Sequence, residues 1–188
     1  MHSLYEHILS RSNLSPEAFE KCLPHFQLRS YPKKHFLIEE GNRVNQQYYV
    51  LKGCLRTYLL DGDKEHTIQF AIENWWVSDY ISYYTGAASQ LRVECIEDVE
   101  LLSIKKQTLE KLIAEIPALE HFFRLQLEGA FVSFQKRILG NLHKSAQERY
   151  DDFLKSYPNI EQRVKNYQIA SYLGVTPESL SRIRKMKG

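Results

Sequence analysis

The sequence predicts an α+β fold in which a small antiparallel β-barrel comes first and a helical region follows. Short β-type runs separated by turn residues fill residues 31–104, as in small antiparallel sandwiches and barrels. From residue 105 onward the apolar residues recur with helical spacing. A content of 43% hydrophobic, 12% aromatic and 26% charged residues is typical of a folded globular protein.

Two short helices are predicted ahead of the barrel, within the first 26 residues. Leu4, Ile8 and Leu9 recur at helical spacing. Ser15 and Pro16 then open a second helix, because a serine hydroxyl caps a helix well and proline suits the first helical position. We expect these helices to cover part of the barrel.

Six short strands are predicted for the barrel. They are residues 35–38, 47–51, 55–60, 65–72, 91–95 and 99–104. The Asp61-Gly62 pair lies between two of them and predicts a tight hairpin, because both residue types tolerate the left-handed backbone of such a turn.

The helical region begins with a short helix and continues with a long one. Thr108 is predicted to cap the short helix, which Pro117 interrupts. The long helix, residues 117–143, is apolar on more than one face. We expect one face to cover the barrel and another to meet its twin in a homodimer. Burial of the whole helix inside a single domain is the alternative.

The chain divides by pattern and by charge. We expect a barrel domain at residues 1–116, the long helix at 117–143 and a helical domain at 144–188. Residues 1–135 carry a net charge of −4, whereas residues 136–188 carry +6. A basic block with apolar periodicity is typical of a folded domain that binds a polyanion. A solvated, charged surface is the alternative.

The segment YQIASYLGVTPESLSRIRKMKG, residues 167–188, predicts a helix-turn-helix. Ala170 is the small residue that lets the two helices cross closely, and Gly174 can take the positive φ of the turn. Thr176 caps the second helix, with Pro177 at its first position. The inward-facing positions are apolar: Ile169, Leu173, Val175, Leu180 and Ile183. A helical hairpin that serves only packing is the alternative.

The outward face of the second helix carries side chains that suit DNA. Arg182 can bind guanine with two hydrogen bonds, Glu178 can accept one from cytosine, and Ser179 can contact a base or a phosphate. Thr176 lies beside them at the start of the helix. Three basic residues are predicted to contact phosphates: Arg184, Lys185 and Lys187.

The order of elements and the segment QIASYLGVTPESLSRIRK resemble the CRP/FNR family of bacterial transcription regulators. The run Tyr49-Val50-Leu51-Lys52-Gly53 also matches a strand-turn pattern of that family. The resemblance implies a jelly-roll barrel of the cyclic-nucleotide-binding type as a sensor domain, a dimer, and base contacts from Glu178 and Arg182. A further base-reading arginine of the family falls on Pro177, and the family's β-wing is not evident before Gly188.

The sensor region departs from the family's phosphate cassette, which has Gly-Glu opening a short helix and Arg-Ser about ten residues later. Here Ser78-Asp79 stands near the first pair and Ala87-Ala88 at the second, so the charge partner of a cyclic phosphate is absent. We therefore expect an unknown effector and no cofactor. The candidate pocket residues are Trp76, Asp79, Tyr80, Tyr83 and Arg92. For the aromatic residues the alternative is ordinary packing, and for Arg92 it is a place on a strand surface.

Other functional classes are disfavoured. No stretch reaches the ~20 apolar residues of a bilayer span, and the N-terminus has no signal-peptide pattern, so we expect a cytoplasmic protein without a membrane partner. The cysteines Cys22, Cys54 and Cys95 are widely spaced, which argues against a disulfide framework or a metal cluster. A cupin-type metalloenzyme needs a His-x-His pair, but Ile68 stands two residues after His66.

The sequence therefore predicts a dimeric transcription regulator of the CRP/FNR type and not an enzyme, with no catalytic residue and no metal site. Double-stranded DNA is the expected partner, and RNA polymerase is a candidate second partner. A module that binds a cyclic nucleotide or another small molecule without binding DNA is the alternative.

Overall fold

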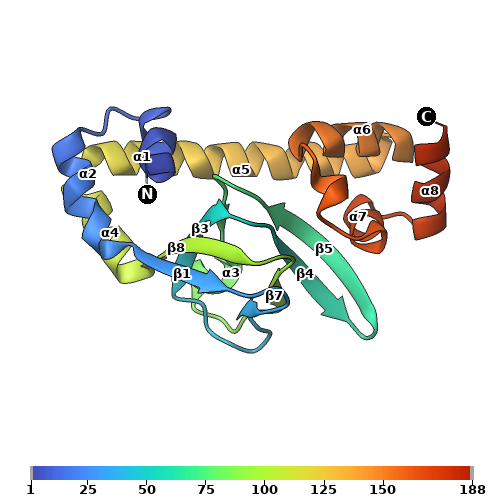
Figure 1. The fold of residues 1–188 in the computed structure, drawn as a ribbon, viewed down its shortest axis with the longest axis horizontal. Coiled ribbons are helices and arrows are strands. Elements are labelled where there is room, and N and C mark those ends of the chain that lie inside the picture. The colour runs from blue at the N-terminus through green and yellow to red at the C-terminus, as the bar shows by residue number, and fades with distance from the viewer. Residues whose placement is uncertain (1, 187–188) are drawn as a thin grey trace.

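The computed structural model describes residues 2–186, so the predicted phosphate contact Lys187 lies outside the described residues. A long helix runs across the whole molecule, with the β-barrel beneath it (Figure 1). The N-terminal helices lie at one end of this helix and the C-terminal helices at the other. The predicted α+β fold is confirmed.

The N-terminal segment forms α1 (His2–Leu9), α2 (Pro16–Cys22) and the 3-10 helix η1 (Leu23–His25). The Ser15 side chain accepts a hydrogen bond from the backbone N–H of Ala18 at 3.2 Å, which confirms the predicted cap. Leu4 and Ile8 are buried, whereas Leu9 is 41% exposed. The segment covers one end of the barrel and the start of the long helix.

The barrel consists of two four-stranded antiparallel sheets. One sheet has the order β1-β8-β3-β6 and the other β2-β7-β4-β5. The strands are β1 (Gln27–Tyr31), β2 (Phe36–Ile38), β3 (Gln46–Lys52), β4 (Leu55–Asp61), β5 (Lys64–Ala71), β6 (Trp76–Val77), β7 (Leu91–Cys95) and β8 (Val99–Lys105). Asp61 pairs with Lys64, and Gly62 has φ 57°, so the predicted hairpin is confirmed.

Three barrel elements lie outside the predicted strands. β1 is almost entirely exposed, so it lacks the alternation of buried and exposed residues by which a strand is read from sequence. β6 has only two residues. The short helix α3 (Tyr80–Thr85) follows β6 and occupies the region of the cassette.

The long helix and its neighbours set the geometry of the C-terminal half. The helix α4 (Lys106–Glu115) starts three residues earlier than predicted, with Lys105 at its N-cap. Thr108 is therefore inside the first turn, and its prediction as the cap was wrong. The helices that follow are α5 (Pro117–His143), α6 (Ala146–Ser156), η2 (Ile160–Gln162), α7 (Asn166–Leu173) and α8 (Pro177–Lys185).

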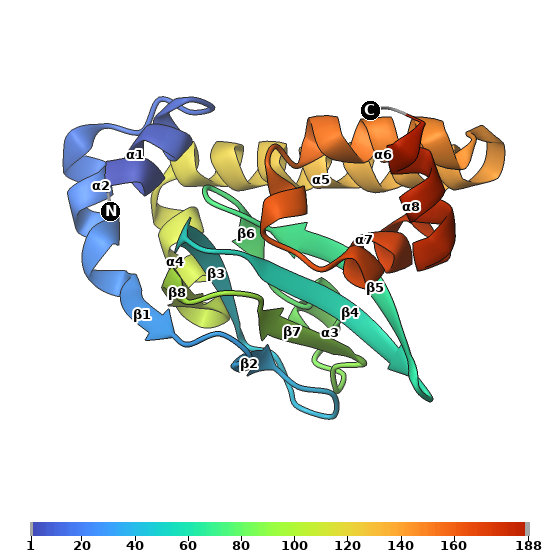
Figure 2. The ribbon, with the colours of Figure 1, turned by 45° about the vertical axis from the view of Figure 1, so that its right-hand side comes forward.

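Three apolar clusters hold these parts together. One joins the N-terminal helices to β3, β8, α4 and the start of α5. A second fills the barrel interior. The third lies between the barrel and the C-terminal helices, so the two halves of the chain share one core (Figure 2). Among the described helices, none is long and apolar enough to cross a membrane.

Candidate functional site

The turn between α7 and α8 has the geometry that the sequence predicts. Gly174 ends α7 with φ 66° and ψ 36°, a left-handed conformation that glycine adopts without strain. The backbone N–H of Val175 donates to the carbonyl of Ala170 at 3.0 Å. Ala170 is buried, so the second helix can pass close to the first. The helix-turn-helix is thus built from local signals in the sequence.

The inner faces of the two helices pack on α6. Ile169, Leu173, Leu180 and Ile183 are buried in one cluster with Tyr150 and Phe153 of α6, and Val175 is half-buried beside it. The N-cap of α6, Ser145, forms a reciprocal capping box with Glu148. Because α6 packs against the inner faces of both helices, it fixes the position of α8 and leaves the outer face of α8 exposed.

The start of α8 is ordered by Thr176. Its hydroxyl accepts a hydrogen bond from the backbone N–H of Ser179 at 3.2 Å, which confirms the predicted cap. Hydrogen bonds to the backbone amide of Glu178 itself and to Thr176 lower the pKa of Glu178. The carboxylate is therefore charged at neutral pH and is an acceptor only.

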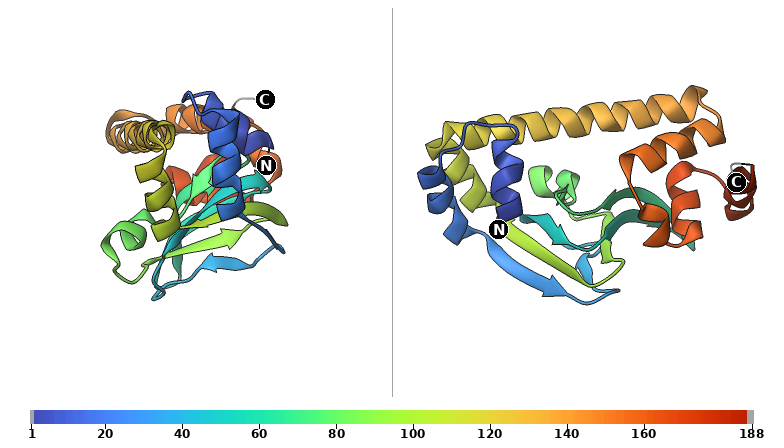
Figure 3. Two further views of the ribbon diagram at one scale, coloured as in Figure 1. Left: turned by 90° about the vertical axis from the view of Figure 1, so that its left-hand side faces the viewer. Right: turned by 45° about the horizontal axis from the view of Figure 1, so that its top comes forward.

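The predicted DNA-contacting residues differ in exposure. Thr176, Glu178, Arg182 and Lys185 are exposed, and Ser179 is half-buried. Arg184 is the exception, because its guanidinium lies 2.7 Å from the carboxylate of Glu161 and donates to the Tyr150 hydroxyl at 3.2 Å. α8 lies at the end of the molecule opposite α2, beyond the barrel (Figure 3).

The sensor cassette has an internal anion at the start of α3. Asp79 is only 2% exposed, and its Oδ1 accepts from the backbone N–H groups of Ile81 at 2.9 Å and Ser82 at 3.2 Å. Its Oδ2 accepts from the hydroxyl of Ser89 at 2.6 Å. The donors that would face a ligand phosphate at this turn are thus occupied by a carboxylate, which also repels an anion.

The residues at the family's Arg-Ser positions and Arg92 do not supply the missing charge. Ala87 and Ala88 have no polar side chain. Arg92 lies on β7 and pairs with Glu40 at 3.3 Å, as the strand-surface alternative expects. The residues present therefore do not fit a cyclic nucleotide held through this cassette.

Comparisons with known proteins match this architecture. The family model of the cyclic nucleotide-binding domain matches residues 28–116. The cAMP-activated global transcriptional regulator CRP of Salmonella typhimurium is 22% identical over 192 residues, which cover 95% of this chain and 90% of the relative. Residues 28–116 therefore match the family of cyclic nucleotide-binding domains, and nearly the whole chain is similar to a CRP regulator.

Solved structures of CRP/FNR family members share the fold. FixK2 from Bradyrhizobium japonicum superposes with a TM-score of 0.75 at 22% identity, over 86% of this chain and 83% of that chain. The c-di-GMP responsive global regulator CLP of Xanthomonas campestris gives a TM-score of 0.72 at 16% identity, over 92% and 91%. At such identities the likeness establishes the fold and leaves the ligand open.

The aromatic pocket candidates belong to two different packed clusters. Trp76 packs against Tyr49 at 5.3 Å and Phe123 at 5.1 Å between ring centroids, in the cluster of the N-terminal helices. Tyr83 belongs instead to the barrel interior, where Tyr80 contacts it edge-on at 6.3 Å. Burial raises the pKa of both tyrosines. The packing alternative accounts for these side chains.

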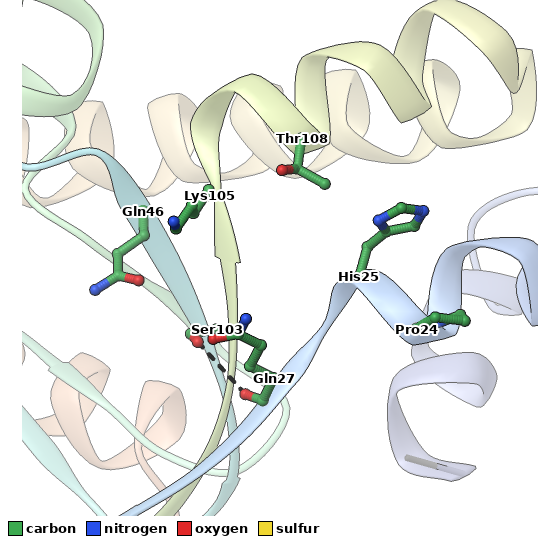
Figure 4. Close-up of a pocket in the computed structure, with 7 residues that line it drawn as sticks. All are labelled: Pro24, His25, Gln27, Gln46, Ser103, Lys105 and Thr108. Carbon is green, nitrogen blue, oxygen red and sulfur yellow. Dashed lines mark hydrogen bonds between the residues drawn. The ribbon is translucent and has the colours of Figure 1, made fainter.

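A pocket at a different place was missed by the sequence reasoning. It has a volume of about 240 Å³ and lies between the start of β1, the end of β8 and the first turn of α4 (Figure 4). Its lining contains no carboxylate and consists of Pro24, His25, Gln27, Gln46, Ser103, Lys105 and Thr108. These residues come from five elements, η1, β1, β3, β8 and α4, so no local pattern joins them. At about 240 Å³ this hollow is smaller than the ~300–1,000 Å³ typical of small-molecule sites.

Metal binding finds no support in the described part of the chain. Within residues 2–186, no three His, Cys, Asp or Glu side chains are grouped closely enough to hold a metal ion. Each of the three cysteines is buried and unpaired with another cysteine. Burial raises the pKa of Cys54 and of Cys95 to about 12, so both thiols are neutral at physiological pH.

Proposed function

We propose that this protein is a dimeric, sequence-specific DNA-binding regulator of the CRP/FNR type that reads its operator with α8. The observation that carries the proposal is the outer face of α8, where Glu178, Arg182 and Lys185 project from a capped helix backed by α6. A helix presented in this way can enter the major groove with its first turns. The apolar cluster that includes the buried residues between 169 and 183 holds α8 in this position on the molecule.

Each exposed side chain has a defined role in this proposal. Arg182 donates two hydrogen bonds to guanine, and Glu178 accepts one from cytosine. Lys185 contacts phosphate, as does Lys187 beyond the described residues. Thr176 and Ser179 contribute hydroxyls at the start of the helix. Arg184 joins them only after its pair with Glu161 opens, so we assign it to domain packing first.

The dimer is proposed to form along α5. Seven large apolar side chains of this helix are at least 43% exposed: Leu127, Phe131, Val132, Phe134, Ile138, Leu139 and Leu142. An exposed apolar row of this length is costly in water, because burial stabilises by about 25 cal/mol per Å² of apolar surface. Pairing with α5 of a second copy would bury the row and set two recognition helices side by side.

The sensor role is proposed for residues 1–116, with 117–143 as the dimerisation helix and 144–188 as the DNA-binding domain. An effector, if it binds, would act by shifting the population of α8 orientations in the dimer. The Asp79 carboxylate argues that this effector is not a cyclic nucleotide held through the usual cassette. Such a regulator works in the cytoplasm, and RNA polymerase is its candidate protein partner.

The test is selection of bound DNA from a random or genomic pool by the purified protein. We expect a palindrome with half-sites about 34 Å apart. Arg182→Ala should lose ~1–3 kcal/mol on the selected site and relax the preference at one base pair per half-site. Arg29→Ala is the matched control, because that exposed arginine lies on β1 of the barrel. Selection of no sequence would favour the alternative, a ligand-binding module without DNA binding.

A further inference from the structure

The contact between the barrel and the C-terminal helices is polar along β5. The backbone N–H of Thr67 donates to the Ser171 hydroxyl of α7 at 2.9 Å, and the Thr67 hydroxyl donates to the carbonyl of Gln168 at 3.2 Å. From the other side, Arg137 of α5 donates to the carbonyl of Thr67 at 3.2 Å. One short stretch of β5 therefore bonds to α5 and α7 at once. In the ribbon, β5 runs beside α7 (Figure 2).

The centre of the same contact is aromatic. Trp75, just after β5, stacks on Tyr157 with 5.2 Å between ring centroids, and Phe70 meets Tyr157 edge-on at 5.9 Å. Phe153 and Tyr172 complete the cluster. Apolar contacts of this kind stabilise the association of the two parts but favour no single orientation. Their free energy depends on the apolar area buried and not on the angle between the groups. They hold the domain on the barrel but do not by themselves fix its orientation.

The orientation of the C-terminal helices on the barrel depends on Arg163, which lies between η2 and α7. Its Nη1 and Nη2 donate to the two oxygens of Glu73 at 2.8 and 2.9 Å, and its Nε donates to Glu97 at 2.9 Å. The Arg163 side chain is 21% exposed. Two-pronged arginine–carboxylate pairs fix geometry as well as distance. Glu73 follows β5 and Glu97 follows β7, so one guanidinium joins two barrel loops to the C-terminal domain.

The Glu73 carboxylate is itself anchored. The backbone N–H of Gly53, in the turn between β3 and β4, donates to it at 2.8 Å. The covalent connection between α5 and α6 is short. The helix α5 ends at His143, Lys144 is extended with φ −90° and ψ 144°, and Ser145 caps α6. A rotation at this connection is opposed by the Arg163 contacts and the β5 contacts together.

We propose that Arg163 is a latch that fixes the orientation of the DNA-binding domain on the barrel, and that its release lets residues 144–186 turn about Lys144 while both parts stay folded. The proposal deepens the DNA-binding function proposed above and rests on it for its consequence. A fixed orientation holds the two α8 helices of a dimer at one spacing, which lowers the cost of ordering on a palindrome. A single half-site gains nothing from a fixed spacing.

The first experiment measures the latch without DNA. Hydrogen exchange is followed at the Thr67 amide, which is bonded across the contact, in the wild type and in Arg163→Ala. We expect exchange to speed up roughly tenfold or more, as for a local opening made easier, with unchanged far-ultraviolet circular dichroism. Arg29→Ala, on the exposed strand β1, is the matched control and should exchange like the wild type. Unchanged exchange at Thr67 in Arg163→Ala would overturn the proposal.

Charge-reversal variants distinguish a loss of the Arg163 contacts from a general loss of folding. Arg163→Glu places like charges beside Glu73 and Glu97 and should open the contact further. Adding Glu97→Arg to that variant restores one opposite-charge pair, and we expect the exchange rate at Thr67 to return part of the way. If the Thr67 amide exchanges as fast in the double variant as in Arg163→Glu, the result contradicts a latch made by residues 163 and 97.

The second experiment connects the latch to DNA. Binding to the selected palindrome and to an isolated half-site is measured by fluorescence anisotropy. In Arg163→Ala we expect palindrome affinity to fall roughly three- to tenfold and half-site affinity to stay level, since the readers on α8 are untouched. Equal losses on both DNAs, or a gain on the palindrome, would refute the ordering role. If the wild type binds neither DNA, the DNA-binding proposal fails, whereas the exchange experiment still decides whether the latch exists.

Discussion

The carboxylate of Asp79 accepts the hydroxyl hydrogen of Ser89 at 2.6 Å, across ten residues of chain. The same carboxylate caps α3 through the amides of Ile81 and Ser82. The cassette region is therefore closed by its own side chains. A phosphate would have to displace a buried carboxylate that makes three hydrogen bonds.

Loss of Asp79 should destabilise the sensor without producing a nucleotide site. We expect Asp79→Ala to lower the free energy of unfolding by ~1–3 kcal/mol, because a helix cap and the partner of the Ser89 hydroxyl are removed together. Thermal denaturation with millimolar cyclic AMP should show no ligand-dependent rise in Tm for the wild type or the variant. Asp63→Ala, in the exposed β4–β5 turn, is the control. A saturable rise in the wild-type Tm would contradict the closed cassette.

DNA binding should weaken with salt, and Lys185 should contribute to that dependence. Release of counterions makes the logarithm of affinity fall linearly with the logarithm of salt concentration. Lys185→Ala should reduce the slope by about 1 on operator and non-operator DNA alike. Lys21→Ala, on α2 at the other end of the molecule, should leave the slope unchanged. A loss confined to the operator would instead make Lys185 a base reader.

Dimer formation should depend on the exposed side of α5. Ile138 is 60% exposed, so Ile138→Asp places a charge where the proposed pairing would bury it, without disturbing the core of the single chain. Light scattering after size-exclusion chromatography should show a dimer for the wild type and a monomer for the variant. Ile81→Asp, 68% exposed on α3, serves as control and should remain dimeric. A dimeric Ile138→Asp protein would rule out this face.

Two turn glycines should respond very differently to the same change. Gly174 has φ 66° and free space for a Cβ atom, so Gly174→Ala should cost only the left-handed strain, ~1–2 kcal/mol. At Gly53, with φ 101°, a Cβ would lie 2.7 Å from the carbonyl oxygen of Asp98. Gly53→Ala should therefore cost several kcal/mol, among the largest single-residue effects. Chemical denaturation of both variants measures the difference, and equal costs would contradict the close approach at Gly53.

Acid should loosen the barrel contact through Glu73. Burial favours the neutral carboxyl, but hydrogen bonds from Arg163 and backbone amides outweigh it, so the pKa of Glu73 lies below its usual 4.5. A lowered pKa means that the folded state gains stability above pH 4.5 and loses it as the pH falls below that value. We expect the protection of the Thr67 amide, measured from its exchange rate relative to that of an unstructured peptide at the same pH, to fall below about pH 4.5 in the wild type. Arg163→Ala should flatten this part of the profile, and an equally steep profile would exclude the pair.

The features predicted from sequence are those that short segments determine. The cap at Thr176, the left-handed Gly174 and the Asp61-Gly62 hairpin each depend on residues within a few positions of one another. The long helix follows from the apolar run over residues 117–143, in which no proline comes after the first position.

The features that were missed depend on distant residues. Arg163 meets Glu73 ninety positions away, and its charge pattern carries no period that would reveal the partner. Arg184 looks free in the sequence but pairs with Glu161 through the fold of its own domain. The base contacts themselves stay predictions, because they depend on a DNA molecule outside the chain.

The length of α5 gives the molecule leverage. At 1.5 Å per residue, its 27 residues extend about 40 Å, from the N-terminal helices to the start of α6. If two copies pair along it, a tilt of only ~10° near the N-terminal end displaces the far end by ~7 Å, about two nucleotide steps of a DNA strand. A change too small to disturb the packing of the barrel can therefore move α8 from one base pair to another.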